Sequence, residues 1–308
     1  MPTRKPAAAP APDTPRSPAQ TAKILAAWQP PLAGLAPVQG KEKKGGKNNP
    51  KPCKMADFDP AAKPLSSGDK ERDKAAVEAL AAELDVLQNL FYADKRHKLL
   101  VVLQGTDTSG KDGTLRGVFS RISPLGVRTT AWKAPSESER AHDYLWRIHQ
   151  AVPGDGEIVL FNRSHYEDVL VPPVNGWITP EQTALRFQHI NDFERLLSET
   201  CTVILKFMLH ISLDEQRERL QERLDDPAKH WKFNMDDLAA RKQWKQYQKA
   251  YEALLNATST PWAPWTVVPA NSKTHRNLMV ATVVRDALRA LDLRYPPGDP
   301  GLKGIKVV

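Results

Sequence analysis

Glycine, lysine and aspartate residues gather in one stretch, residues 105–114, which reads Gly-Thr-Asp-Thr-Ser-Gly-Lys-Asp-Gly-Thr. Two glycines in the spacing G-x-x-x-x-G-K let the backbone turn tightly, so that successive N–H groups can point at one anion. The Lys111 ammonium would bind phosphate oxygens, and a helix that begins near Gly110 would add its positive end. The stretch therefore predicts a phosphate-binding loop that uses Lys111, Gly105, Gly110, Gly113 and Thr114.

Two carboxylates lie in this loop. Asp107 is inside it, and Asp112 takes the position after the lysine where a Ser or Thr normally binds magnesium. A carboxylate among phosphates is unfavourable unless a cation or a transferable proton lies between them, so both residues are predicted to face magnesium or the substrate. For Asp112 alone, capping of the following helix is the alternative. For the whole loop, the alternative is an ordinary strand-to-helix turn.

A second polar cluster follows another apolar run, residues 157–161. Phosphate-loop enzymes usually place an acid at the end of a neighbouring strand to hold magnesium through water. Here Asn162 and Arg163 follow the run, and Glu167 and Asp168 come shortly afterwards. Arg163 is predicted to bind phosphate and Glu167 to act in the site, whereas Asp168 is left open. The alternatives are a structural salt bridge for Arg163 and stabilisation of a helix N-terminus for the two acids.

Basic residues recur between residues 217 and 249, with acids and two tryptophans among them. Solvated helix faces with i,i+4 ion pairs explain much of this pattern. They explain the break at residues 225–232, Asp-Asp-Pro-Ala-Lys-His-Trp-Lys, less well. This break predicts a mobile lid that brings cations over a phosphate and excludes water.

Strands and helices must position these side chains, and they alternate along the chain. Short apolar runs predict strands at residues 99–104, 127–132, 157–161, 202–209 and 266–268. Amphipathic spacing and capping boxes predict helices at residues 69–94, 110–122, 136–151, 179–197, 236–256 and 273–293, with a further one capped by residues 212–215. This order implies an α/β fold with a parallel sheet covered on both faces. Ligands should then bind at the carboxyl ends of the strands, where the phosphate loop lies.

The net charge of +8 belongs to the N-terminal segment. Residues 1–54 hold ten Lys or Arg and two acids, so the rest of the chain, with 34 basic and 34 acidic residues, has no net charge. We therefore expect no nucleic-acid partner. Because residues 1–54 are rich in Pro, Ala and Lys and can bury little, they are predicted to be a disordered tail, with one docking turn at residues 24–28 as an exception.

Apolar runs of membrane-spanning length are absent from the sequence, as is an N-terminal secretory segment. Cys53 and Cys201 are the only cysteines, and neither belongs to a paired framework. We expect two free thiols in a reducing compartment and hence a cytoplasmic protein without a membrane partner.

Several runs together resemble the polyphosphate kinase 2 family over about residues 55–295. Besides the loop, these are His-Asp-Tyr-Leu-Trp-Arg at 142–147, Phe-Asn-Arg-Ser-His-Tyr-Glu-Asp-Val-Leu-Val at 161–171, Asp-Pro-Ala-Lys-His-Trp-Lys at 226–232 and Ala-Pro-Trp-Thr-Val-Val-Pro at 263–269. The Asn-Arg-Ser-His-Tyr-Glu run resembles the class III branch, which phosphorylates nucleoside mono- and diphosphates. Other branches tend to show Asp-Arg-Ser-Trp-Tyr there.

The resemblance implies a P-loop kinase-like three-layer sandwich at residues 55–295, with a helical lid at about 217–249 and tails at 1–54 and 296–308. It also implies phosphate transfer from inorganic polyphosphate to AMP and ADP, with Mg²⁺ as cofactor, Mn²⁺ as its substitute, and a homodimer or homotetramer. An ATP-dependent nucleoside monophosphate kinase and a non-catalytic polyanion-binding module remain the alternatives.

Residue roles follow from the matching motifs. The implied catalytic residues are Asp107, Lys111, Asp112, Arg163 and Glu167, of which the three acids position metal and nucleotide. The implied lid cations along the polyphosphate chain are Arg223, Lys229 and Lys232, and Arg147 would contact the nucleotide. Asn162 stands where many relatives have an acid, and residues 171–174, Val-Pro-Pro-Val, replace a stretch where relatives often show an arginine and a histidine.

Overall fold

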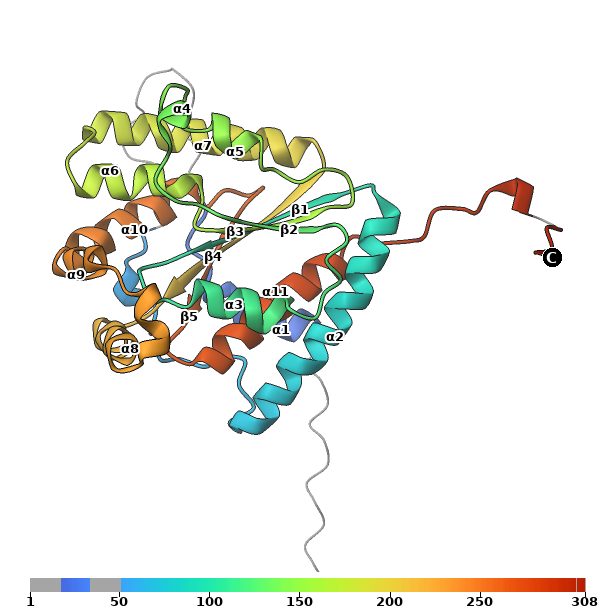
Figure 1. Ribbon diagram of the computed structural model, residues 1–308, viewed down its shortest axis with the longest axis horizontal. Coiled ribbons are helices and arrows are strands. Elements are labelled where there is room, and N and C mark those ends of the chain that lie inside the picture. Colours follow the sequence, from blue (N-terminus) through green and yellow to red (C-terminus); the bar gives the residue numbers. More distant parts are fainter. Residues whose placement is uncertain (1–17, 34–50, 303, 308) are drawn as a thin grey trace, which may run out of the picture.

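Five parallel strands form one sheet in the order β2-β3-β1-β4-β5 (Figure 1). The computed structural model describes residues 18–33, 51–302 and 304–307. The strands are β1 (Lys98–Gln104), β2 (Val127–Ala131), β3 (Ile158–Asn162), β4 (Thr202–His210) and β5 (Trp265–Pro269). Each lies within one residue of its predicted bounds, and the parallel α/β arrangement is confirmed.

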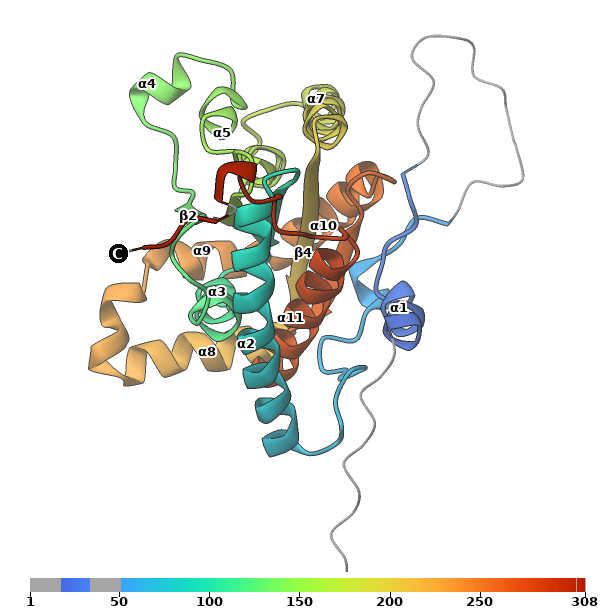
Figure 2. The same ribbon diagram turned by 90° about the vertical axis from the view of Figure 1, so that its right-hand side faces the viewer.

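Helices cover both faces of this sheet (Figure 2). One layer contains α2 (Lys70–Asp94), α3 (Lys111–Phe119) and α11 (Lys273–Arg289), and the other contains α5 (Trp146–His149), α7 (Pro180–Glu199) and α10 (Trp244–Thr258). In β1, Leu99, Val101 and Leu103 pack on the first layer, whereas Leu100 and Val102 pack on the second. Residues 99–103 of this central strand are all apolar because both of its faces are buried.

The remaining elements lie around this sandwich. At its carboxyl edge are α8 (Leu213–Asp225), the 3₁₀ helix η3 (Pro227–Lys232) and α9 (Met235–Lys242) (Figure 1). The short elements are η1 (Met55–Asp57), α4 (Glu137–Arg140), η2 (His165–Val169), α6 (Val171–Val174) and η4 (Pro300–Leu302). No described helix is long and apolar enough to cross a membrane.

Two predicted helices are each divided in the structure. The range 136–151 contains α4 and α5, because the Asp143 carboxylate accepts hydrogen bonds from the N–H groups of Leu145 and Trp146, at 2.9 and 3.0 Å, and starts a new helix. The predicted capping box of Ser136 is present at the start of α4. The range 236–256 contains α9 and α10, which are separated at Gln243.

Part of the segment predicted as a disordered tail is folded, so that prediction is wrong for residues 18–23, 29–33 and 51–54, whereas residues 24–28 do dock on the core as expected. Helix α1 (Pro18–Ala26) buries Leu25 in the core, and Trp28 accepts a hydrogen bond from the N–H of Val267 in β5, at 2.8 Å. Cys53 is also buried and, like Cys201, forms no disulfide. A few apolar side chains dock this segment although its average composition is polar. Residues 1–17 and 34–50 lie outside the described residues.

Histidine burial gives the fold a pH-dependent stability. Burial lowers the pKa of His275 to about 4, from 6.5, and its Nε2 accepts the N–H of Leu65 at 3.2 Å. The unfolded chain therefore binds a proton that the folded chain excludes between pH 6.5 and 4, so the free energy of unfolding should fall by up to about 3 kcal/mol as the pH falls through this range. Urea unfolding at a series of pH values measures this slope.

The variant His275→Gln keeps a hydrogen-bond acceptor for Leu65 but does not titrate, so its slope between pH 6.5 and 4 should be shallower. Burial also lowers the pKa of His210 to about 4, so part of the slope should remain. The exposed His142 offers a control, because His142→Gln should leave the slope unchanged. Equal slopes in wild type and His275→Gln would contradict the prediction.

Candidate functional site

The loop between β1 and α3 is closed around the Lys111 ammonium. Gly105 and Gly110 have φ angles of 147° and 100°, and a Cβ on Gly105 would lie 2.5 Å from the Leu209 carbonyl oxygen. Lys111 Nζ donates to the carbonyl oxygens of Gly105 and Thr106, at 2.8 and 3.1 Å. Thr114 Oγ1 donates to the Gly110 carbonyl oxygen, so it stabilises the loop and does not line the cleft described below.

Lys111 is buried, and this changes its titration. Burial lowers the pKa of Lys111 to about 8 and the Arg163 cation adds to the effect, whereas the carboxylates of Asp107, Glu167 and Asp112 oppose it. Within the described residues, no carboxylate forms an ion pair with the Lys111 ammonium. A buried ammonium without a paired acid is suited to bind an incoming anion.

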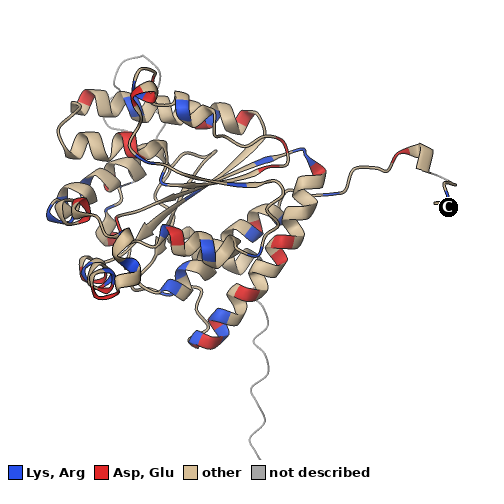
Figure 3. Ribbon diagram, viewed as in Figure 1, with Lys and Arg blue, Asp and Glu red and all other residues tan. Residues whose placement is uncertain are grey.

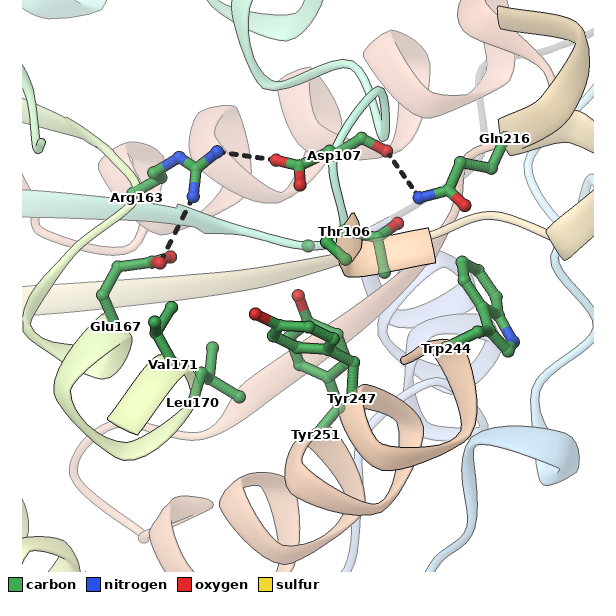
Figure 4. A pocket seen from close by; sticks show the side chains of 12 residues that line it. Thr106, Asp107, Arg163, Glu167, Leu170, Val171, Gln216, Trp244, Tyr247 and Tyr251 are labelled. Carbon is green, nitrogen blue, oxygen red and sulfur yellow. Dashed lines mark hydrogen bonds and ion pairs between the residues drawn. The ribbon is translucent and has the colours of Figure 1, made fainter. Parts of the chain in front are cut away.

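Arg163 connects the two predicted catalytic acids beside the loop (Figure 4). Its Nη2 lies 2.6 Å from Asp107 Oδ1, and its Nη1 lies 3.3 Å from Glu167 Oε2. Gln104 Nε2, at the end of β1, donates to the other Glu167 oxygen at 3.0 Å. Burial acts to lower the pKa of Arg163, but the two carboxylates hold it above its usual range. Because β1 and β3 are neighbours, their carboxyl ends place these residues together.

The third predicted acid, Asp112, faces a different partner. Asn162 Nδ2 donates to Asp112 Oδ1 at 2.7 Å, and Lys232 Nζ lies 3.9 Å from Asp112 Oδ2. In the part of the chain that the structure describes, no three His, Cys, Asp or Glu side chains are placed to hold a metal by themselves. The three acids thus form no closed metal cage. Carboxylates in this number do fit Mg²⁺ binding that is shared with substrate phosphates and water.

A cleft of about 600 Å³ opens above the loop. Its wall includes residues from the loop, the end of β2, α8, η3, and the start of α11. Four acids line it, Asp107, Asp112, Glu222 and Asp237, together with nine basic residues. The nine are Lys111, Lys133, Arg163, Arg219, Arg223, Lys229, Lys232, Lys273 and Arg276. The cleft is therefore strongly basic, which favours a polyanionic ligand. Along the ribbon as a whole, Lys and Arg are mixed with Asp and Glu, in keeping with a domain that has no net charge (Figure 3).

The predicted lid cations line this cleft. Arg223 Nη1 lies 3.1 Å from Asp237 Oδ2, and Lys229 Nζ lies 3.0 Å from Asp226 Oδ2. Arg147, by contrast, does not line the cleft: it is buried behind Trp132, with its guanidinium 5.2 Å from the ring centroid. The predicted nucleotide contact of Arg147 is thus not placed in the cleft, although its neighbour Trp132 is.

A smaller pocket of about 40 Å³ lies on the other side of Asp107, Arg163 and Glu167 (Figure 4). Tyr247 and Tyr251 of α10 line it, and burial raises the pKa of both hydroxyl groups. At about 40 Å³, this pocket is far smaller than the cavities of roughly 300–1,000 Å³ that hold small-molecule ligands. The two phenols close the site on this side.

A buried polar cluster supports the turn that carries Arg163 and Glu167. Lys206 Nζ lies 2.6 Å from Glu194 Oε2 and donates to Tyr166 Oη and the Thr258 carbonyl oxygen, at 2.7 and 2.8 Å. Tyr166 Oη and His165 Nε2 both contact Glu194 Oε1, at 2.7 and 3.2 Å. This cluster ties η2 to α7, β4 and α10. This cluster was not predicted from the sequence, because Glu194 and Lys206 resemble ordinary surface residues there.

Four further cleft residues were not predicted from the sequence. Trp132 and Lys133 follow β2, while Lys273 and Arg276 begin α11. A usable signal was present, because the first residues after each parallel strand lie at the carboxyl edge of the sheet. This rule identifies Trp132 and Lys133, which directly follow β2, but not Arg276, which lies in the first turn of α11.

Comparisons with known proteins agree with one another. A family model described as polyphosphate kinase 2 matches residues 67–295. The AMP/ADP-polyphosphate phosphotransferase of Meiothermus ruber is 51% identical over 239 residues, which cover 78% of this chain and 90% of that protein. The ADP-polyphosphate phosphotransferase of Rhodopseudomonas palustris is 38% identical over 243 residues, which cover 75% of this chain and 84% of that protein. A crystal structure of polyphosphate kinase 2 from Arthrobacter aurescens matches with a TM-score of 0.78 and 43% identity, covering 83% of this chain and 90% of that one.

Proposed function

Because this chain belongs to the polyphosphate kinase 2 family, we propose that its basic cleft transfers phosphate from inorganic polyphosphate to AMP and ADP. The name of the Meiothermus ruber relative supports both acceptors. The observation that carries the proposal is the convergence of nine basic side chains on a cleft that ends at the Lys111 ammonium. The fold is the P-loop kinase-like sandwich expected for this chemistry.

Each part of the site has a role in this transfer. Lys111 and the loop N–H groups bind the terminal phosphoryl group of polyphosphate, on whose oxygens charge is spread in the transition state. A phosphate oxygen of AMP or ADP attacks this phosphorus in line, and the bond to the bridging oxygen of the next phosphate breaks. The products are the extended nucleotide and a polyphosphate shorter by one unit. Arg163 adds positive charge beside the reacting group and connects Asp107 and Glu167.

A divalent cation fits this site, and we assign Mg²⁺, with Mn²⁺ as its substitute. Asp107, Asp112 and Glu167 would hold it together with phosphate oxygens and water, since Mg²⁺ prefers hard oxygen ligands and retains water. When bound, such a cation would supply positive charge that neutralises phosphate oxygens. Asn162 contributes by fixing the direction of the Asp112 carboxylate, with the 2.7 Å hydrogen bond described above.

Removing single charges from the loop tests this assignment. Asp107→Asn and Asp112→Asn keep the side-chain shape, so each should raise the Mg²⁺ concentration needed for half-maximal turnover. The two variants are measured separately, because residues that act as a unit are not additive. Asp192→Asn, at an exposed position on α7, should leave the Mg²⁺ titration unchanged. Unchanged titrations in both loop variants would show that these acids are only caps.

Nucleotide analysis tests the function itself. The protein is incubated with Mg²⁺ and AMP or ADP, with either polyphosphate or ATP as donor, and the nucleotides are separated and quantified. We expect ADP and ATP to form with polyphosphate. If ADP forms from AMP only when ATP is the donor, the protein is a nucleoside monophosphate kinase. If no nucleotide product forms with either donor, the remaining alternative is a polyanion-binding module. A homodimer or homotetramer stays a prediction that light scattering can check.

A further inference from the structure

Arg276 is a buried cation in the first turn of α11. It is only 3% exposed, yet it forms part of the cleft wall. Its Nε and Nη2 both donate to Asn277 Oδ1, at 3.2 and 2.9 Å. Among the described residues, no Asp or Glu side chain forms an ion pair with it. A buried guanidinium normally needs an anionic partner. In Arg276, only the edge formed by Nε and Nη2 donates hydrogen bonds to Asn277.

The other edge of Arg276 faces the phosphate loop. A Cβ on Gly110 would collide with Arg276 Nη1, and a Cβ on Gly113 would lie 2.9 Å from Nη2. The guanidinium therefore lies against the start of α3. Gly110 and Gly113 allow this close approach because they lack side chains. An anion at the N-terminus of α3 would thus meet Nη1, which has no hydrogen-bond partner in the described part of the chain.

The surroundings of Arg276 increase its demand for an anion. Burial and the neighbouring Arg219 lower the pKa of Arg276 to about 10. The Arg219 guanidinium is already used, because it donates to the carbonyl oxygens of Thr108, Ala270 and Asn271, at 2.9, 2.7 and 3.0 Å. Arg219 therefore supports the loop backbone, while Arg276 keeps an unused donor edge.

Lys273 extends this basic surface toward solvent. It is the first residue of α11, its side chain is 61% exposed, and it lines the cleft with Glu222 at 3.4 Å. Residues three apart lie on the same face of a helix, so Lys273 and Arg276 share a face of α11. Together with Lys111 they place three basic side chains in the wall of the cleft.

We propose that Arg276 and Lys273 form a second phosphate subsite, which binds polyphosphate units behind the terminal phosphoryl group held at Lys111. The inference rests on the proposed function, because it takes polyphosphate as the donor. The subsite directs the polyphosphate chain along the start of α11, away from Trp132 and Lys133 at the end of β2. A chain with a charge on every phosphate matches a row of cations better than a single phosphate does.

Binding and kinetics with Arg276 variants test the subsite. The dissociation constant of long-chain inorganic polyphosphate is measured by calorimetry without nucleotide or metal, and KM is measured for polyphosphate and for ADP. Arg276→Gln should raise the dissociation constant and the polyphosphate KM by about tenfold or more, because it removes charge-assisted hydrogen bonds. The KM for ADP should not change, and kcat should change far less than the polyphosphate KM.

Three further variants sharpen this test. Arg276→Lys keeps the charge and should recover part of the affinity. Lys273→Ala should weaken binding at low salt only, because its exposed charge is screened. Lys70→Ala removes the same charge from an exposed position at the start of α2 and should bind polyphosphate like wild type.

Other outcomes would overturn the subsite. A lower kcat with an unchanged polyphosphate KM would place Arg276 on the reacting phosphoryl group. Equal increases in both KM values, with reduced stability, would make Arg276 only a support for the loop. If the proposed function is wrong, the wild-type protein will lack polyphosphate-dependent turnover. The binding titration would then still show whether Arg276 contributes to polyphosphate binding.

Discussion

Replacing Lys111 by alanine should leave a folded protein whose turnover with polyphosphate is lower by about a hundredfold or more. Lys111 Nζ is the only ammonium that the phosphate loop encloses among the described residues, and its hydrogen bonds go to two loop carbonyl oxygens. Charge developing on the transferred phosphoryl group would lose its nearest stabilising cation. The measurement is kcat at saturating polyphosphate and ADP.

Stability provides the control for this variant. The buried Lys111 ammonium has no acid paired with it in the described structure, so its removal should not lower the free energy of unfolding. Lys111→Arg keeps the charge but changes its shape, and should recover little turnover because the loop encloses a compact ammonium. Near-normal polyphosphate-dependent turnover of a folded Lys111→Ala protein would remove Lys111 from the mechanism.

The strands and the phosphate loop could be predicted because their signals are local. An apolar run such as residues 99–103, buried on both faces, has few alternatives to a central strand. The spacing of Gly105, Gly110 and Lys111 then places a loop directly after it. The two divided helices could not be predicted in this way, since Asp143 starts a new helix by accepting two N–H groups, and many aspartates within helices do not.

The part of the candidate site that follows the ends of neighbouring strands could be predicted from the sequence. Arg163 and Glu167 meet Asp107 because β1 and β3 are adjacent, and alternating strands and helices already indicate where such strands end. Arg276 depends on α11 packing against α3, which is a long-range contact. Its charge within an amphipathic helix resembles a solvated residue until that packing is known.

The buried cluster below the site gives the largest expected effect on stability. Lys206 and Glu194 are both fully buried, and their charged groups lie 2.6 Å apart. Water cannot take the place of either charged group if that group is removed. Lys206→Met would leave the Glu194 carboxylate without its main compensating charge, and should lower the free energy of unfolding by about 3–5 kcal/mol. Urea unfolding measures the loss. Arg195→Met offers a control on the same helix, because its pair with Asp192 is exposed and should cost less than about 1 kcal/mol.

The double variant Lys206→Met with Glu194→Gln separates the charge from the packing. If the loss comes from an uncompensated carboxylate, the double variant should be more stable than Lys206→Met alone. If the loss comes from altered packing near Trp265, the second substitution should not restore stability. Turnover should fall in Lys206→Met even where the protein is fully folded, because the cluster holds Tyr166 within the turn that carries Arg163 and Glu167. Wild-type turnover in the folded fraction would show that the cluster stabilises the fold without positioning the site.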